Sequence, residues 1–186
     1  ERGPATRRRA RAAGLCEVDS LPALAAQAEI AISLVAADAA EDTARLFAEA
    51  RAPGAAPLFA DLNSIGPDLA RRIAERLGTR GIPCVDGALH GQAHRLPAGG
   101  VLYLCGVDAP RLAALFGPEL ETRLLGPEIG AASLLKLLLS CVSKSLVALC
   151  LELGAAAQDA RTWPAFWEAV ARFYPELAEA VERMGP

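Results

Sequence analysis

The 186-residue chain has few of the residues that build metal sites or disulfide frameworks. Its five cysteines form no C-x-x-C pair, and its only histidines are His90 and His94, with no cysteine or carboxylate beside them at ligand spacing. This pattern argues against a zinc site and against a disulfide scaffold. We therefore expect no metal, and the expected compartment is a reducing cytoplasm.

The chain also lacks an excess of positive charge. Its net charge is −3, its pI is about 5.5, and aromatic residues make up only 5%. A general nucleic-acid binder is normally basic, so nucleic acid is not an expected partner. With 53% apolar residues, the chain has enough material for a core in one large domain or two small ones.

Lysine is the scarcest charged residue. Of the nineteen basic residues, only Lys136 and Lys144 are lysine, and both lie in the most apolar run, residues 129–151. Their charges interrupt this run, so we expect no membrane span, and no signal peptide is recognised.

The order of apolar segments predicts an α/β fold followed by an all-helical part. Strands are expected at residues 28–35, 58–62, 82–85 and 101–105, with helices at 39–51 and 67–78 between the first three. Strands that alternate with helices indicate a parallel sheet. One long helix at 129–153 and shorter helices at 164–184 follow, so we expect domains at 1–120 and 121–186.

The predicted long helix carries a narrow polar stripe. With Lys136 as reference, Ser133, Ser140, Ser143 and Lys144 fall within an arc of about 100°. A helix that is apolar around the rest of its circumference is usually buried, so the stripe is expected to line a cleft. An ammonium group changes its pKa when it is partly buried, which a guanidinium does not, so lysine here favours a chemical role over a structural one.

Polar loops follow the predicted strands. Residues 34–38, 61–67 and 86–91 lie where open parallel sheets bind ligands. Asn63 and Ser64 precede a helix that begins at Pro67, a favourable place for a substrate carboxylate or phosphate, although a turn with a helix cap explains the same residues.

Read in order, five segments resemble the 3-hydroxyisobutyrate and 6-phosphogluconate dehydrogenase superfamily. More closely, they resemble its branch in which a 6-phosphogluconate-dehydrogenase-type NAD(P)-binding domain carries a distinct helical carboxyl-terminal domain. The resemblance covers about residues 10–180 and rests on the segments AEIAISLVAADAA, LFADLNSIGPDLARRIAERL, GIPCVDGALHG, VLYLCGVDAPRLAALFG and IGAASLLKLLLSCVSKSLVAL.

The resemblance implies an incomplete Rossmann-type sheet and a role for each matching residue. Lys136 matches the catalytic lysine. The implied substrate-binding residues are Asn63, Ser64, Gly87, His90, Ser140 and Lys144. The implied cofactor-binding residues are Leu34, Val35 and Ala36 in the loop after a strand, and Arg7 and Arg8, which match the position that binds the 2′-phosphate of NADP. NADP is therefore the expected cofactor, with NAD as the alternative.

The chain also departs from the family pattern. His90-Gly91-Gln92 stands where hydroxyisobutyrate-type enzymes have Ser-Gly-Gly, and Ser140 replaces an asparagine. These departures argue against a substrate identical to that of the best-known members. The first βαβ unit, with its G-x-G-x-x-G loop, has no match, so by the resemblance the chain begins just after that unit's second strand.

Two functions are compatible with these observations. The first is an NAD(P)-dependent oxidoreductase, or a large part of one, acting on a small hydroxy-acid, carbonyl or imine substrate, as a homodimer through its helical part. The second is a non-catalytic derivative that serves as a helical dimerisation or small-anion-binding module.

Overall fold

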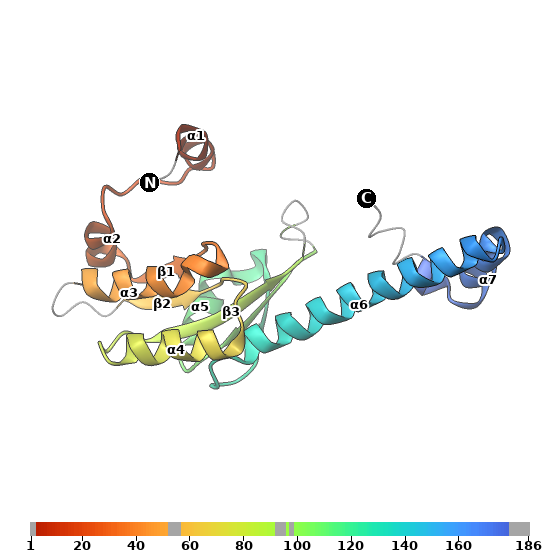
Figure 1. The fold of residues 1–186 in the computed structure, drawn as a ribbon. Coiled ribbons are helices and arrows are strands. Elements are labelled where there is room, and N and C mark those ends of the chain that lie inside the picture. Colours follow the sequence, from red (N-terminus) through yellow and green to blue (C-terminus); the bar gives the residue numbers. More distant parts are fainter. Residues whose placement is uncertain (1–2, 52–56, 92–95, 97–98, 179–186) are drawn as a thin grey trace. The chain divides into compact units, whose positions relative to one another are not determined.

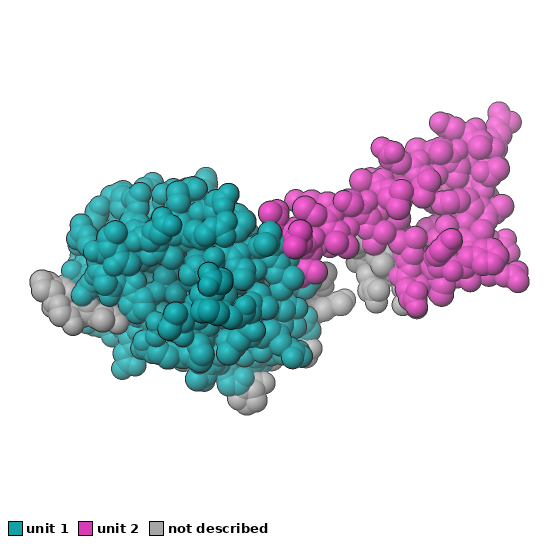
Figure 2. Space-filling model, turned by 90° about the horizontal axis from the view of Figure 1, so that it is seen from below, with its two compact units in different colours: residues 1–136 teal, residues 137–186 magenta. Residues whose placement is uncertain are grey.

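The computed structural model divides into two compact units, residues 1–136 and 137–186 (Figures 1 and 2). It describes residues 3–51, 57–91, 96, 99–178. His94 and the last six residues of the helical segment predicted at 164–184 lie outside these residues. The domain boundary expected at 120/121 stays a prediction.

A five-stranded sheet forms the centre of the first unit, with strand order β1-β2-β3-β4-β5. The strands are β1 (Ile30–Ser33), β2 (Leu58–Asp61), β3 (Cys84–His90), β4 (Val101–Cys105) and β5 (Glu121–Leu124). The pairs β1–β2, β2–β3 and β4–β5 are parallel, which agrees with the sequence prediction, but β4 runs antiparallel to β3. The connection between them is too short for the crossover of a dozen or more residues that a parallel pair requires.

Helices cover both faces of this sheet. Helices with bounds inside the described residues are α1 (Pro4–Ala12), α2 (Leu21–Gln27), α3 (Ala40–Ala50), α4 (Pro67–Gly78), α5 (Ala109–Phe116), α6 (Ala131–Asp159) and α7 (Trp163–Phe173). Single 3₁₀ turns occupy Ala37–Ala39 and Gly117–Glu119.

The two faces of the sheet have separate apolar cores. On one face, Phe59 packs with the buried residues of α3 and α4, among them Phe47 and Ile73. On the other face, Leu58 and Leu104 belong to a cluster that includes the buried residues of α5. Because side chains alternate along a strand, β2 presents Phe59 and Asp61 to the α3/α4 face and Leu58 and Ala60 to the α5 face.

Helix α4 shows how local sequence sets an element. Pro67 occupies its first turn together with Asp68, where proline fits the backbone and a carboxylate faces the positive end of the helix dipole. The buried residues Ala70, Ile73 and Leu77 recur every three or four positions and pack on the sheet. Proline at the start and this spacing made the helix predictable at its observed bounds.

Helix α6 is far less buried than its composition predicts. From residue 137 to residue 153, each side chain on α6 is exposed or half-buried. The prediction that the helix is buried therefore does not hold for residues 137–153, and the prediction that its polar stripe lines a cleft stays a prediction. By length and composition alone, α6 would suffice to cross a membrane.

The second unit has a small core of its own. Gly154 lies against the ring of Trp163, and Ala157, Val170 and Ala178 are buried. Trp163 stacks on Trp167 with ring centroids 5.9 Å apart. Within the described residues of this unit, few large side chains are enclosed, and the apolar side of α6 is left exposed.

Gly106, at the end of β4, provides a test of this architecture. Its φ of +118° is unfavourable for other residues, and a Cβ there would lie 2.9 Å from the backbone oxygen of Cys84 and 3.0 Å from Ile129. We expect Gly106→Ala to lower the free energy of unfolding by about 1–3 kcal/mol. Chemical denaturation measures this loss.

Gly78→Ala is the matched control. Gly78 ends α4 with open space around its Cα, so alanine should leave stability unchanged or raise it by up to about 1 kcal/mol. Equal losses in both variants would contradict the close packing at Gly106.

Candidate functional site

Four polar side chains form a row across the sheet. Ser33 pairs with Asp61, Asp61 with Asp86, and Asp86 with Cys105, in register on β1 to β4. All four are buried, and the parallel strands β1 and β2 end at these residues. We call these four residues the polar row. Buried polar groups at the carboxyl ends of parallel strands mark the edge where such sheets bind ligands.

Asn63 joins two loops beside the polar row. Its Oδ1 accepts a hydrogen bond from the backbone N–H of Val35 at 2.6 Å, and its Nδ2 donates to Ser33 Oγ at 2.8 Å. Its own backbone N–H donates to Asp61 Oδ1 at 2.9 Å. The side chain is only 3% exposed. Asn63 thus connects the loop after β1 with the loop after β2.

Asp61 keeps one oxygen without a partner. Within the described residues, its Oδ2 is buried and accepts no hydrogen bond. Loss of hydration raises the pKa of Asp61, and the neighbouring Asp86 carboxylate adds to the rise, while the hydrogen bonds from Asn63 oppose it. A polar atom left in this condition is costly.

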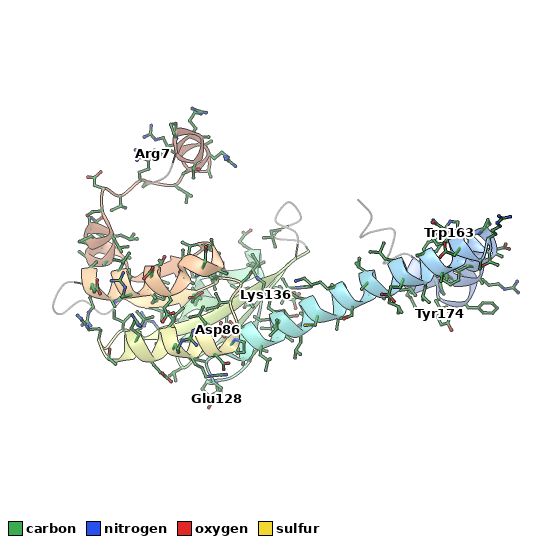
Figure 3. All side chains as sticks on the ribbon, in the orientation of Figure 1. Arg7, Asp86, Glu128, Lys136, Trp163 and Tyr174 are labelled. Carbon is green, nitrogen blue, oxygen red and sulfur yellow. The ribbon has the colours of Figure 1, made fainter. Side chains whose placement is uncertain are left out.

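Asp86 holds the first turn of α6 against the sheet. Its Oδ2 accepts hydrogen bonds from the backbone N–H groups of Gly130 at 3.0 Å and Ser133 at 3.1 Å, and from Cys105 Sγ at 3.2 Å. Its Oδ1 accepts from Ser133 Oγ at 2.6 Å. Figure 3 labels Asp86 beside the start of this helix. Both carboxylate oxygens are therefore used by residues distant in sequence.

The helix start also meets the loop that carries Asn63. A Cβ on Gly130 would lie 3.2 Å from the backbone oxygen of Pro67, the first residue of α4. Gly130 has a φ of +99°, which glycine adopts readily. The absence of a side chain allows the two helix starts to approach closely.

Lys136 follows Ser133 by one turn on α6. The side chain is half-buried, and burial lowers the pKa of its ammonium group. It is the last residue of the first unit. A lysine with a lowered pKa can give or take a proton nearer to neutral pH than an exposed lysine can.

The two thiols near the polar row are poor nucleophiles. Burial raises the pKa of Cys105 to about 11 and also raises the pKa of Cys84. The thiolate is the reactive form of cysteine, so both residues act as packing groups and weak hydrogen-bond partners.

The other residues predicted from the sequence have more varied surroundings. Ser64 and His90 are exposed, as are Leu34 and Ala36, whereas Val35 is half-buried. Gly87 is buried on the opposite face of β3, where a Cβ would lie 2.2 Å from Leu62 Cδ2. The immediate reason for glycine there is packing.

The basic and helical candidates lie outside the polar row. Arg7 and Arg8 are exposed on α1, a helix with no buried residue. Ser140 and Lys144 belong to the second unit, where Ser140 is half-buried and Lys144 is exposed. The structure brings Asn63 and Val35 into direct contact.

Sequence reasoning missed three residues of this network: Ser33, Cys105 and the anchoring role of Ser133. Asp61 and Asp86 begin the polar loops predicted at 61–67 and 86–91. A signal was present, because carboxylates inside apolar strands are rarely buried without partners. The described residues include no cluster of three or more histidine, cysteine or acidic side chains able to hold a metal ion.

Comparisons with known proteins place the fold. No family model matches the chain, and no curated protein sequence matches it. Among solved structures, a conserved protein of unknown function described as similar to 3-hydroxyacid dehydrogenases is 26% identical, with a TM-score of 0.80. The match covers 98% of this chain and 69% of that protein.

Two further solved structures have a fold similar to that of this chain. A conserved hypothetical protein from Sinorhizobium meliloti is 26% identical with a TM-score of 0.74, and the match covers 94% of this chain but only 57% of that protein. A reductive aminase from Aspergillus terreus, solved with NADPH4, cyclohexanone and allyl amine, is 20% identical with a TM-score of 0.75 over 97% of this chain and 64% of its own. The chain therefore has a Rossmann-type fold with a helical carboxyl-terminal part, similar to 3-hydroxyacid dehydrogenases and imine-reducing enzymes, and spans between half and about two thirds of their length.

Proposed function

We propose that the protein is an NAD(P)-dependent oxidoreductase, or a large part of one, that acts on a small hydroxy-acid, carbonyl or imine substrate in the cytoplasm. The observation that carries this proposal is the half-buried Lys136 one turn after the helix start that Asp86 holds at the polar row. The fold, shared with structures of dehydrogenases and reductases, supports the same class of reaction.

In this proposal Lys136 is the proton donor and acceptor. In the reductive direction its ammonium gives a proton to the substrate oxygen or nitrogen, and in the oxidative direction its amine takes that proton back. Its lowered pKa brings this exchange closer to neutral pH. Ser64, exposed at the same edge of the sheet, is a candidate to orient the substrate.

The residues after β1 fit a nicotinamide cofactor in part. When bound, NADP or NAD supplies or accepts the hydride. Leu34 and Ala36 are exposed at the end of a parallel strand, where they can contact a flat ring, and Asn63 holds Val35 between them. The guanidinium groups of Arg7 and Arg8 suit phosphate oxygens, which favours NADP over NAD.

Substitution of the two lysines tests the proposal. In the full-length protein, Lys136→Arg should lower kcat/KM by about 10²–10⁴, because guanidinium keeps its proton. The assay follows NADPH absorbance with a panel of small carbonyl compounds, imines and 2- and 3-hydroxy acids.

Lys144→Arg is the matched control, since Lys144 is an exposed lysine on the same helix. We expect it to retain most of the activity, with both variants melting within a few degrees of the parent. Full activity in Lys136→Arg, or activity lost only through unfolding, would make Lys136 a structural residue. A parent protein without NADPH-dependent activity on the panel would favour the non-catalytic module.

We also propose that α6 pairs with a second copy of the chain. Leu138, Val142, Leu149 and Leu153 are exposed and recur every four or seven residues, so they share one side of the helix. Surface of this kind on a soluble dehydrogenase-like fold is typical of a homodimer interface.

Two leucines on different sides of α6 allow a specific test of this interface. Loss of the interface can then be distinguished from the effect of adding a charge anywhere on the helix surface. Leu149 is 52% exposed and lies on the apolar side, whereas Leu151 is 69% exposed and lies on the side of Lys144. We expect Leu149→Glu to convert the dimer to monomer at micromolar concentration and Leu151→Glu to leave it dimeric. Sedimentation velocity measures both, and a monomeric parent protein would refute the pairing.

A further inference from the structure

The first turn of α6 is satisfied by side chains from the sheet. Helix starts normally leave backbone N–H groups without partners, and a nearby residue of the same segment usually caps them. Here Gly130 and Ser133 donate to Asp86, and the N–H of Ala132 donates to Cys105 Sγ at 3.4 Å. The partners come from β3 and β4, so the cap is tertiary and not local.

This cap restrains the rotation of the helix as well as its position. Asp86 contacts Ser133 twice, through the backbone N–H and through the hydroxyl, and both oxygens of the carboxylate take part. A carboxylate at a helix start also gains from the helix dipole. Two contacts to one residue determine which side of the first turn faces the sheet.

We propose that Asp86, acting through Ser133, is the positioning residue of Lys136. Lys136 is one turn beyond Ser133, so the rotation that Ser133 imposes decides where the ammonium group lies. Without the anchor, the first turn of α6 can roll or fray, and Lys136 becomes exposed. The proposal rests on the proposed function only for the chemical task of Lys136, because its position can be measured without substrate or cofactor.

Several charged and titratable groups lie near this helix start, among them Glu128, which precedes Gly130 by two residues, and Tyr103 on β4, which packs on the cluster that includes Ala132. Asp61 on β2 neighbours Asp86, Cys84 and Cys105 belong to β3 and β4, and Arg71 on α4 would contact a side chain at position 130. Burial is the cause of the lowered pKa of Lys136. A change that exposes Lys136 should therefore raise its pKa toward the ordinary 10.5.

Because the chain has only two lysines, the pKa of Lys136 can be measured by itself. In the full chain with Lys144→Arg, Lys136 is the only lysine, so ¹³C-labelled lysine gives one side-chain signal whose pH titration reports one pKa. Ser133→Ala removes the hydroxyl without changing charge, and we expect the pKa of Lys136 to rise toward 10.5. Ser133→Thr keeps a hydroxyl and should restore the parent titration.

Asp86→Asn provides a second variant should Ser133→Ala not fold. Loss of a negative neighbour alone would lower the pKa of a lysine, whereas release of the helix start raises it, so a rise supports positioning and a fall overturns it. Leu112→Ala, which destabilises the same unit from the core on the opposite face of the sheet, should leave the titration unchanged.

The outcomes separate the positioning role from the proposed function. An unchanged Lys136 titration in folded Ser133→Ala, or an equal shift in Leu112→Ala, overturns the positioning role. If the expected shift is found but Lys136→Arg remains active, the positioning role stands and the proposed proton-transfer role of Lys136 fails.

Discussion

The hydrogen bonds between Asp86 and the start of α6 are the interaction on which this structure depends most. They connect the sheet with the helix that carries Lys136 and continues into the second unit. A buried carboxylate is unfavourable unless donors surround it, and Asp86 receives four. The two contacts to Ser133 specify which side of the first turn of α6 faces the sheet.

In the rest of the polar row, the buried polar atoms also have hydrogen-bond partners, with one exception. Asn63 uses its amide oxygen, amide nitrogen and backbone N–H to satisfy Val35, Ser33 and Asp61. This arrangement holds two loops together at the carboxyl ends of β1 and β2. Within the described part of the chain, Asp61 Oδ2 is the buried side-chain atom left unsatisfied, and such atoms concentrate where stability is given up for function. Hydrogen bonds thus hold the carboxyl ends of β1 and β2 together, and within the described residues Asp61 Oδ2 is left without a partner.

The exposed apolar surface of α6 reflects how little protein accompanies it in the second unit. Gly154, Ala157 and Ala178 allow close helix packing there, but small side chains bury little apolar area. The unit therefore lacks the core that would cover leucines such as Leu149. A helix of this composition is stable in water only when something packs against it, which is the physical basis for expecting a second copy.

Sequence alone determined the elements and much of their order. Pro67 with the spacing of apolar residues specified α4, and alternation of strands with helices specified the parallel pairs β1–β2 and β2–β3. Tertiary structure decided the antiparallel β3–β4 pair, the polar strand β5 and the exposure of α6. It also decided the contact between Asp86 and Ser133, 47 residues apart, because no local pattern encodes which buried donor meets which distant carboxylate.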